Sequence, residues 1–390
     1  MLSKLARDLM LRLKTGEPGA LPVVVGLALI WSFFELQDAH FLTPRNISNL
    51  VLQVSVSGTI AVGLVFVLLL GEIDLSVGSV AGASAAVLGV LVVDQDWPWW
   101  TAVIVMLGFG TLIGALQGAW FALLRVPSFV VTLAGLLIWL GVQLHVLGDA
   151  GTLNVFEPHI TAIASTFLPQ GWSWTLAVLA VVCLGGARLA ENALRRQARM
   201  TARSTPILLV ETGIIAALLF GSFAVLNSAY GVPTAGVLLF FLVMLFDWLA
   251  RRTTFGRHVY AVGGQAEAAR RAGIGVTRIR ITVFALAGFL AAAGGLISTA
   301  RLQAASTQTS GGTLLLESMA AAVIGGTSLF GGRGTVWAAL LGALVIRSVS
   351  NGLDLVDQPA DVKYMVEGAI LLLAVTIDAY SRRRLTVTGR

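Results

Sequence analysis

Long apolar runs alternate with short polar connections along almost the whole chain of 390 residues. Runs of about twenty residues have the length that crosses the hydrocarbon core of a bilayer as a helix. A β-barrel would instead show short segments in which apolar and polar residues alternate. The apolar segments lie at about 19–37, 50–70, 76–93, 99–123, 129–147, 172–190, 205–226, 232–250, 279–300, 315–329, 335–352 and 363–380.

This pattern predicts an all-α polytopic membrane protein with about ten full crossings. The segment at 315–329 is too short to cross alone, so we expect broken or re-entrant helices near 71–79 and 325–334. The connections are too short for a separate soluble domain. The predicted parts are a cytoplasmic tail at 1–18, a single transmembrane domain at 19–380, a cytoplasmic loop within it at 251–278 and a cytoplasmic tail at 381–390.

Composition excludes an ordinary soluble domain, because 57% of the residues are hydrophobic, 12% are charged and the mean hydropathy is +0.87. The net charge of +6 does not indicate nucleic-acid binding, since the cations gather in the connections between apolar runs. Cys183 is the only cysteine, which excludes an intrachain disulfide and a cysteine-based metal site.

Positive charge alternates from one connection to the next and so predicts orientation. Of the 26 lysines and arginines, 21 lie in five segments, and the connections between these segments carry mostly aspartate and glutamate. Cytoplasmic loops of membrane proteins carry an excess of lysine and arginine, so both termini are predicted to be cytoplasmic. The five basic segments are the N-terminal tail, 123–128, 188–204, 251–280 and the C-terminal tail.

The connection at 251–280 has seven arginines, the most of any connection, and it has internal order. Gly263-Gly264 interrupts the chain, residues 265–272 are rich in helix formers, and Gly273 is a natural helix stop. We predict a turn, a helix of about two turns and a stop. Two interpretations stay open: a helix that docks against a partner protein, and a solvated loop that only sets topology.

Two glycine-rich stretches interrupt apolar runs. They are Gly71–Ser79 (GEIDLSVGS) and Gly325–Gly334 (GGTSLFGGRG), and we place both on the non-cytoplasmic side. Non-helical backbone at membrane depth is tolerated only where protein buries it or water lines it. Paired interruptions in two halves of a chain point to a transport pathway.

Glu72 and Asp74 lie in the first of these stretches, where an ionised side chain is costly. A functional role is the first hypothesis for both residues. The alternative is structural, with Asp74 or Ser76 capping the helix that begins near Val77. Glu211, Asp247, Glu317 and Glu367 lie near the ends of spans, and we interpret most of them as interfacial.

Small and amide side chains predict how the spans pack. Gly110, Gly114 and Gly118 form a ridge with a spacing of four, which favours close packing inside the molecule. Gln117 and Gln143 are placed to form hydrogen bonds between helices.

Enzymatic motifs are absent from the sequence. No G-x-x-x-x-G-K-[ST] motif occurs, so the chain is not itself a P-loop ATPase. No G-x-S-x-G or H-E-x-x-H occurs, and the four histidines are scattered. We expect no catalytic residue, no metal and no cofactor.

Six stretches occur together and in a fixed order: 46–50 (NISNL), 71–79 (GEIDLSVGS), 126–135 (VPSFVVTLAG), 254–257 (TFGR), 260–264 (YAVGG) and 323–329 (VIGGTSL). In this combination the chain resembles the permease family of bacterial ABC importers for monosaccharides such as ribose, arabinose, galactose and xylose. The resemblance runs from about Leu42 to the C-terminus. Within the family, the loop 148–171, the insert 188–204 and the end 369–378 look most like D-xylose permeases.

The resemblance implies a multi-subunit importer in the bacterial inner membrane. Two permease subunits, expected to form a homodimer, would be driven by a cytoplasmic ATP-binding subunit and supplied by a periplasmic sugar-binding protein. Membrane lipid surrounds such a permease. One departure is Ala272, where relatives usually have serine or threonine. The coupling helix of the family carries over to Gly256, Ala261, Gly264, Glu267, Ala268, Gly273 and Ile274.

An uncharged sugar needs groups that match its hydroxyls and no fixed counter-ion. We expect hydroxyl side chains beside flexible glycines to supply weak hydrogen bonds along the translocation pathway. The predicted pathway residues are Glu72, Asp74, Ser76, Gly78, Ser79, Gly325, Gly326, Thr327 and Ser328.

Three other functions compete with this interpretation. A proton-coupled secondary transporter would use Glu72 and Asp74 and would need no ATPase. An ABC permease of the same fold could carry a branched-chain amino acid or a furanose-type signal, but a charged cargo requires a buried pair of opposite charges, and only acids are evident. An intramembrane enzyme ranks last for lack of a site.

Overall fold

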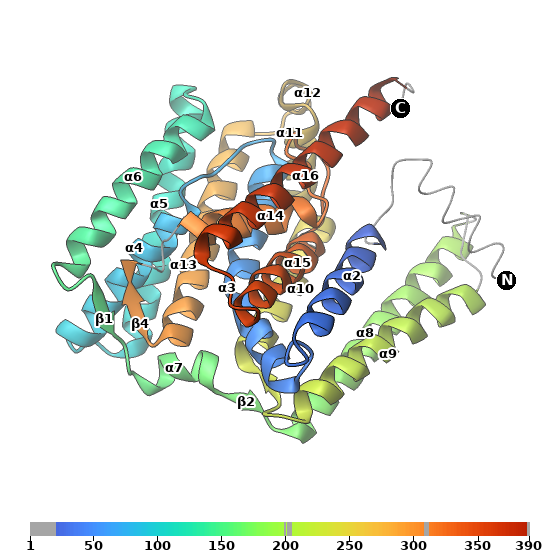
Figure 1. Ribbon diagram of the computed structural model, residues 1–390. Coiled ribbons are helices and arrows are strands. Elements are labelled where there is room, and N and C mark those ends of the chain that lie inside the picture. The colour runs from blue at the N-terminus through green and yellow to red at the C-terminus, as the bar shows by residue number, and fades with distance from the viewer. Residues whose placement is uncertain (1–20, 199, 201–204, 308–311, 388–390) are drawn as a thin grey trace.

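The computed structural model describes residues 21–198, 200, 205–307 and 312–387 (Figure 1). The predicted tail at 1–18 and the last residues of the tail at 381–390 lie outside this range. The helices are α2 Leu21–Gln37, α3 Pro44–Leu69, α4 Val77–Gly89 with a π-helical extension Val90–Asp94, α5 Trp99–Leu124, α6 Ser128–Leu147, α7 Pro158–Ser165, α8 Gln170–Gln197, α9 Thr205–Asn227, α10 Thr234–Arg252, α11 Thr254–Gly264, α12 Ala266–Arg271, α13 Val276–Leu302, α14 Gly312–Ile324, α15 Val336–Leu355 and α16 Ala360–Val387.

In the part of the chain that the structure describes, nine helices are long and apolar enough to cross a membrane. The prediction of an all-α polytopic membrane protein is confirmed. Both predicted interruptions are found as non-helical links, one at 70–76 between α3 and α4 and one at 325–335 between α14 and α15. The short predicted segment at 315–329 corresponds to α14, which has only 13 residues.

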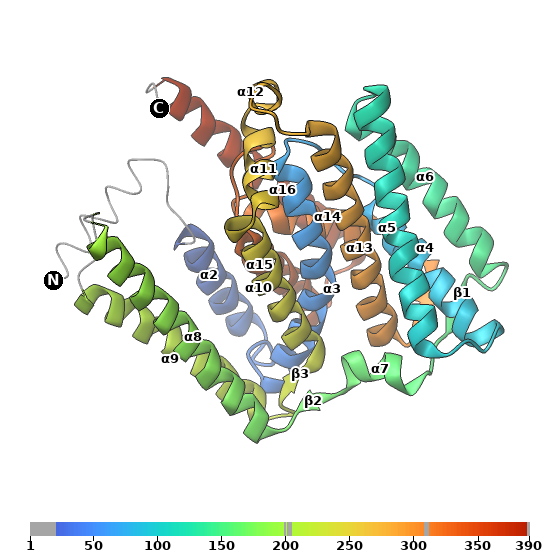
Figure 2. The same cartoon turned by 180° about the vertical axis from the view of Figure 1, so that it is seen from behind.

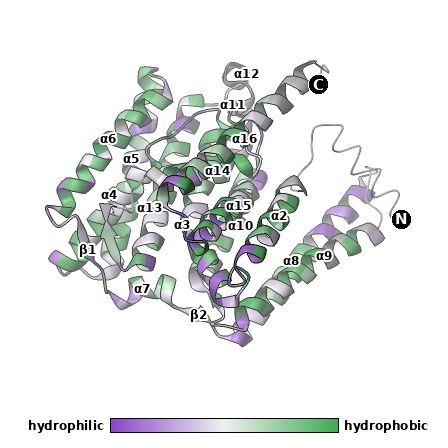
Figure 3. Ribbon diagram, viewed as in Figure 1, coloured by the Kyte–Doolittle hydropathy of each residue, from purple (hydrophilic) through white to green (hydrophobic). Residues whose placement is uncertain are grey.

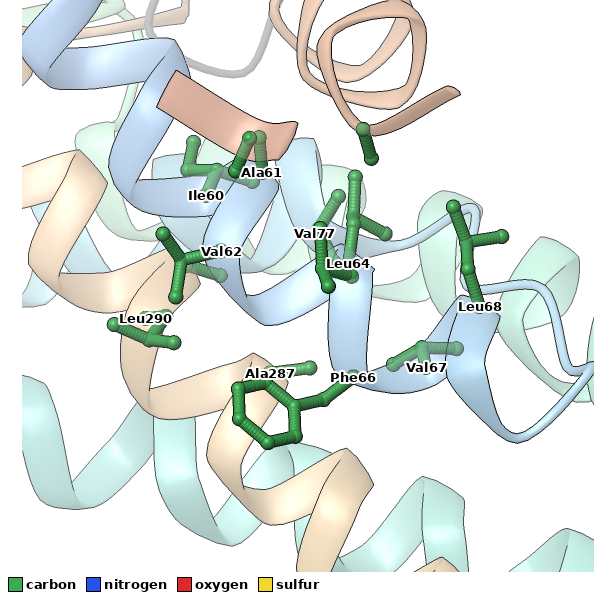
Figure 4. Packing of buried hydrophobic residues seen from close by; sticks show 14 of the residues in the cluster. Ile60, Ala61, Val62, Leu64, Phe66, Val67, Leu68, Val77, Ala287 and Leu290 are labelled. Carbon is green, nitrogen blue, oxygen red and sulfur yellow. The ribbon is translucent and has the colours of Figure 1, made fainter. Parts of the chain in front are cut away.

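α3 is the central helix, with 89% of its most hydrophobic window buried. It packs against α10, α13, α14 and α15. Figure 4 shows Val62 and Phe66 of α3 beside Leu290 and Ala287 of α13, and Leu64 of α3 beside Val77 of α4. Lipid tails are as apolar as these side chains, so close packing, and not transfer out of water, holds the helices together.

The predicted glycine ridge lies in the contact between α5 and α13. A Cβ atom on Gly114 would lie 2.1 Å from the carbonyl oxygen of Phe284, and one on Gly110 would lie 2.6 Å from that of Gly288. The ridge therefore lets the two backbones touch, and the prediction of packing inside the molecule is confirmed.

The outer helices present apolar side chains outward (Figure 3). Only 22% of the hydrophobic window of α6, 12% of that of α8 and 6% of that of α9 is buried. α8 and α9 form a hairpin at the edge of the molecule (Figures 1 and 2). Apolar surface of this extent is suited to contact with lipid.

The two ends of the helix bundle differ in structure (Figures 1 and 2). α11 and α12 lie at one end. The opposite end carries α7 and two short antiparallel ribbons, which join distant parts of the chain. They pair β1 Thr152–Asn154 with β4 Ala304–Ser306 and β2 Phe167–Leu168 with β3 Val232–Pro233. Gln143 of α6 donates a hydrogen bond of 2.8 Å to the carbonyl oxygen of Ser306 in β4, and so joins a helix to a strand and not to another helix as predicted.

Candidate functional site

The basic connection folds into α11 and α12 (Figure 2). The predicted helix at 265–272 is confirmed as α12, and Gly273 follows it with a φ of +84°, a left-handed conformation that favours glycine. α11 was not predicted from the sequence. It begins at a Thr253 cap, whose hydroxyl accepts a backbone hydrogen bond of 3.3 Å from Gly256.

α12 is displayed on the surface. Ala269 is its one buried residue, while Glu267 pairs with Arg270 at 3.0 Å and with Arg271 at 3.7 Å. Pairs at these spacings stabilise an exposed helix by about 0.2–0.5 kcal/mol each. The sequence therefore makes a short helix that keeps most of its side chains free for contact with another molecule.

Gly263, near the end of α11, touches the end of α3 just before the first interrupted stretch, and it also touches the second interrupted stretch. A Cβ atom on Gly263 would lie 1.7 Å from the carbonyl oxygen of Leu69 and 2.9 Å from the amide nitrogen of Gly332. Gly332 donates its N–H to Leu69 at 2.9 Å. Backbone from three segments meets here at a distance that no side chain permits. We call this contact the junction; it consists of Leu69, Gly71, Gly263, Gly331 and Gly332.

The junction requires glycine for conformation as well as for space. Gly71, Gly331 and Gly332 all have positive φ values, of +76°, +84° and +73°. A Cβ atom on Gly331 would also lie 2.7 Å from the carbonyl oxygen of Gly263 and 2.9 Å from the nitrogen of Gly71. The glycine-rich sequence of both stretches thus has a physical cause.

The junction corrects the expected position of the two stretches. They lie at the α11–α12 end of the bundle, on the side of the basic connection, and not on the opposite side as predicted. The reason is the direction of the helices. α3 runs toward the end that holds α11, so link 70–76 follows it there, and α14 and α15 bring link 325–335 to the same end (Figures 1 and 2).

Tyr260 of α11 adds a side-chain contact beside the junction. Its hydroxyl donates a hydrogen bond of 2.9 Å to the carbonyl oxygen of Gly334 in link 325–335. Burial raises the pKa of Tyr260 above its ordinary value, so the phenol remains a protonated donor at neutral pH. α11 therefore holds link 325–335 through backbone packing and through one directed bond.

Glu72 fixes link 70–76 to the start of α13. Its carboxylate pairs with Arg280 at 3.0 Å, and the guanidinium of Arg280 lies 5.3 Å from the ring centroid of Phe121. The two side chains of the pair are partly buried, at 17% and 27% exposure. Glu72 is therefore paired in this conformation, and it ties the link to two spans.

Asp74 caps the turn that leads into α4. It is 3% exposed and accepts hydrogen bonds from the backbone nitrogen of Ser76 at 2.8 Å and from its hydroxyl at 2.6 Å. Ser76 also reaches Gln117 of α5 at 3.0 Å. Burial raises the pKa of Asp74, and the bonds from Ser76 act in the opposite direction. These bonds close a turn at 74–76, but Ser76, the residue before α4, makes no side-chain capping bond to the helix, so the expected capping of α4 by Asp74 or Ser76 is not found.

Most of the other predicted pathway residues are closely packed, whereas Gly326 is exposed and a Cβ atom on it would have no neighbour within 4 Å. Ser79, Thr327 and Ser328 are 4%, 1% and 8% exposed. A Cβ atom on Gly78 would lie 3.3 Å from Leu315 of α14, so α4 and α14 approach each other there. Gly325 lies against the backbone of Ala338 in α15, where a Cβ atom would be 1.9 Å from its carbonyl oxygen. This end of the bundle is closed in the present conformation.

The seven predicted coupling residues fall into three groups by their surroundings. Gly256 lies against the carbonyl of Ala250, where α11 turns away from α10. Ala261, Gly264, Glu267, Ala268 and Gly273 are exposed, and Ile274 packs against the main core. Gly273, which is exposed, is followed directly by Ile274, which packs against the core.

A second polar group lies away from the junction. It consists of Arg301 at the end of α13, Glu317 of α14, Arg347 of α15 and Glu367 of α16, and we call it the charged node. Glu317 forms an ion pair with Arg347, whose Nε donates a hydrogen bond of 3.2 Å to Ser57 of α3.

The charged node corrects two expectations. Glu317 and Glu367 are 4% and 6% exposed, so they are buried and not interfacial. A buried pair of opposite charges does exist, although only acids were evident in the sequence. Arg347 was missed even though a lone arginine in the apolar run 335–352 is a signal for an intramembrane functional group.

Comparison with known proteins decides the family. The family model described as "Branched-chain amino acid transport system / permease component" matches residues 46–375. The chain belongs to this permease family. It is therefore a multi-pass membrane permease component and not a catalytic subunit. No solved structure matches the chain.

Several curated relatives of this permease cover most of its length. The xylose transport system permease protein of Escherichia coli strain K12 is 38% identical over 92% of this chain and 91% of its own. The protein of the same name from Haemophilus influenzae is 36% identical over 96% of this chain and 100% of its own. The ribose import permease protein of Bacillus subtilis is 30% identical over 91% of each chain.

Proposed function

We propose that this permease is the membrane subunit of an ATP-driven importer that carries a monosaccharide, D-xylose, across a bacterial inner membrane. The observation that carries the proposal is similarity over nine-tenths of the chain to proteins named as xylose permeases. Relatives named for ribose match with lower identity, which favours a pentose as the cargo and xylose as the specific one.

The partners follow from this role. A cytoplasmic ATP-binding subunit supplies the energy, a periplasmic sugar-binding protein delivers the cargo, and two copies of the permease form the pathway. In this proposal α11, α12 and both termini are cytoplasmic, because cytoplasmic connections carry the excess of lysine and arginine. The end that carries α7 and the two ribbons then meets the sugar-binding protein.

In this proposal the ATP-binding subunit docks on α12. Closure of the ATP-binding subunits displaces α12 and, through α11, the junction. Because Gly263 touches Leu69 and Gly332, one displacement reaches both interrupted stretches. The residues with this coupling role are Gly256, Ala261, Gly264, Glu267, Ala268, Gly273 and Ile274.

The two interrupted stretches form the cytoplasmic gate of the pathway. They are closely packed in this conformation, and a displacement of the junction separates them, so that the cargo passes inward by alternating access. Ser76, Ser79, Thr327 and Ser328 offer hydroxyls to the passing sugar, while Glu72 and Asp74 hold the link at 70–76 in shape. Gly78 and Gly325 allow the close approach of backbone, and Gly326 supplies a left-handed turn with a φ of +101°.

Two alternative functions would give different results in the reconstitution experiment described below. A proton-coupled secondary transporter would use Glu72 and Asp74 as proton carriers, but Glu72 is paired with Arg280 and Asp74 caps a turn. A charged cargo was expected to require a buried pair of opposite charges, and Glu317 with Arg347 provides one, so this pair does not exclude that alternative. The pairing of Glu72 and the turn at Asp74 favour transport driven by ATP over a proton-coupled transporter.

The decisive experiment purifies the permease with the ATPase encoded beside it and reconstitutes the pair in proteoliposomes. ATP hydrolysis and sugar uptake are measured with a cognate binding protein loaded in turn with xylose, ribose, arabinose or galactose. We expect xylose to give the largest stimulation of both rates. Uptake on a proton gradient by the permease alone would establish the secondary transporter instead.

A further inference from the structure

The charged node has no role in the proposed coupling path, although its position in the membrane is expensive. Charged side chains inside a bilayer are costly and mark substrate pathways or relays. Replacing a buried ion pair by apolar residues is often neutral or stabilising, so a pair of this kind is weak evidence for a stabilising role. The burial of Glu317 and Arg347 therefore calls for a function.

The node joins side chains from five helices. Arg347 reaches Glu317 of α14 and Ser57 of α3, and Glu367 of α16 forms a hydrogen bond with Ser350 of α15. Arg301, at the end of α13, lies near enough for its charge to act on both members of the ion pair. With two arginines and two glutamates, the node has a formal charge of zero.

The hydrogen-bonding capacity of the node exceeds what the described residues use. A guanidinium carries five N–H donors, whereas Arg347 donates to Ser57 and Glu317 only, and Arg301 has no partner among the residues that the structure describes. The hydroxyl of Ser318, beside Glu317 on α14, is fully buried and lacks a partner within that same part of the chain. Donors and acceptors remain for a ligand.

The spare groups match the chemistry of a sugar. Each hydroxyl of a monosaccharide both donates and accepts a hydrogen bond, so neighbouring hydroxyls suit a site that presents guanidinium donors and carboxylate acceptors together. Zero net charge suits a neutral cargo, because a fixed excess charge would hold an ion there. Arg301 is only partly buried, while Glu317 is almost fully buried, so the node extends inward from the end of α13.

We propose that the charged node, with Arg301, Glu317, Arg347 and Glu367, forms a hydroxyl-binding subsite for the monosaccharide inside the membrane, closed in this conformation by the ion pair between α14 and α15. The inference rests on the proposed function and names the part of the path that the sugar occupies. α14 leads from Glu317 directly to link 325–335, which touches α11 at the junction. Displacement of the junction therefore moves Glu317 relative to Arg347 and exposes both to the cargo.

The test measures sugar binding and transport separately. The permease–ATPase complex is placed in lipid nanodiscs, and binding of D-xylose in the absence of the binding protein is followed by saturation-transfer NMR. Uptake and ATP hydrolysis are then measured in proteoliposomes with saturating loaded binding protein. The variants are Arg301→Gln, Glu317→Gln and the double variant Glu317→Gln/Arg347→Gln. Arg195→Gln, which breaks an exposed pair with Glu191 on α8, is the control.

We expect each node variant to weaken xylose binding by about tenfold or more, since hydrogen bonds to charged groups are among the strongest in proteins. We also expect the amount of sugar moved per ATP hydrolysed to fall in these variants. The Arg195→Gln control should match the wild type in both binding and transport. The double variant removes both charges together and so guards against misfolding caused by one unpaired ion. Deoxy analogues of xylose that lack one hydroxyl group should lose less binding affinity, relative to xylose, in the variants than in the wild type.

Two results would overturn the subsite. One is a folded double variant that binds and transports xylose like the wild type; the other is a set of variants that change only thermal stability, which would make the node a structural latch. Either result leaves the importer in place. Failure of the wild-type complex to move any sugar with ATP would instead remove the proposed function.

Discussion

At the scale of residues, the structure shows why particular glycines and one tyrosine stand where they do. Gly263 is needed for space, while Gly71, Gly331 and Gly332 are needed for backbone conformation. The sequence showed that these stretches were interrupted. It did not show that α11 would touch both of them, because contacts between residues this far apart depend on how whole helices are arranged.

A methyl group at Gly263 tests the junction. Gly263→Ala would place a Cβ atom 1.7 Å from the carbonyl oxygen of Leu69, so α11 must shift away from both links. Overpacking of this kind costs about 1–3 kcal/mol, and we expect xylose uptake to fall more than ATP hydrolysis does. Gly108→Ala, where a Cβ atom has no neighbour within 4 Å, should behave like the wild type in the same assay.

Tyr260→Phe removes one hydrogen bond and changes little else. The phenol donates to Gly334 at 2.9 Å, and its loss leaves a carbonyl of link 325–335 without this donor, at a cost of about 1 kcal/mol. We expect a modest fall in sugar moved per ATP hydrolysed, with normal expression. Unchanged coupling in a well-folded Tyr260→Phe complex would show that backbone contacts alone hold the link.

At the scale of elements, hydrophobic length and charge predicted most of what is found. The spans near 99–123, 129–147 and 232–250 lie within a few residues of α5, α6 and α10. α12 was predicted from its helix formers and flanking glycines. α11 was missed because Gly256, Gly263 and Gly264 lower its helix propensity, and contacts with α10 and α13 stabilise it instead.

The α5–α13 contact makes a prediction about stability. Gly114→Val would force side-chain carbon into the carbonyl of Phe284, which is 2.1 Å from the nearest possible Cβ position. We expect a loss of at least about 1–3 kcal/mol, seen as a lower melting temperature in detergent and poorer expression. Gly141→Val, on α6 in open space, serves as the comparison and should melt near the wild-type temperature.

The exposed face of α12 makes a prediction about docking. Glu267→Arg reverses the only acidic charge on this helix, and Ala268→Pro removes a backbone N–H and distorts the helix. Both variants should leave the permease folded in the membrane while ATP hydrolysis loses its link to uptake. Wild-type coupling ratios in both would contradict the docking role, and circular dichroism of the purified permease checks that the fold is kept.

At the scale of the whole molecule, the arrangement places both interrupted stretches and the basic connection at one end. About ten crossings were predicted, and the described residues contain nine helices that are long and apolar enough to cross. We assigned the interrupted stretches to the wrong side because the glycines were considered without regard to the direction of α3. The charged node could not be predicted from the sequence, for a different reason. Glu317, Arg347 and Arg301 come from three helices whose neighbours are fixed only by the complete packing.

Orientation can be measured directly with single cysteines. In a Cys183→Ser background, Asp96→Cys lies at the end with the ribbons and Arg271→Cys lies on α12. A membrane-impermeant maleimide added to intact spheroplasts should label the first variant only, and should label both after lysis. The reverse pattern would place α12 outside the cell and remove the docking proposal.

The junction also has a consequence for timing. Its contacts join backbone to backbone, with no long side chain between α11 and either link to absorb a small displacement. Movement of α11 should therefore reach link 70–76 and link 325–335 together and not one after the other. A single subunit would then pass between closed and open in one concerted step, without a long-lived form in which only half of the gate has parted.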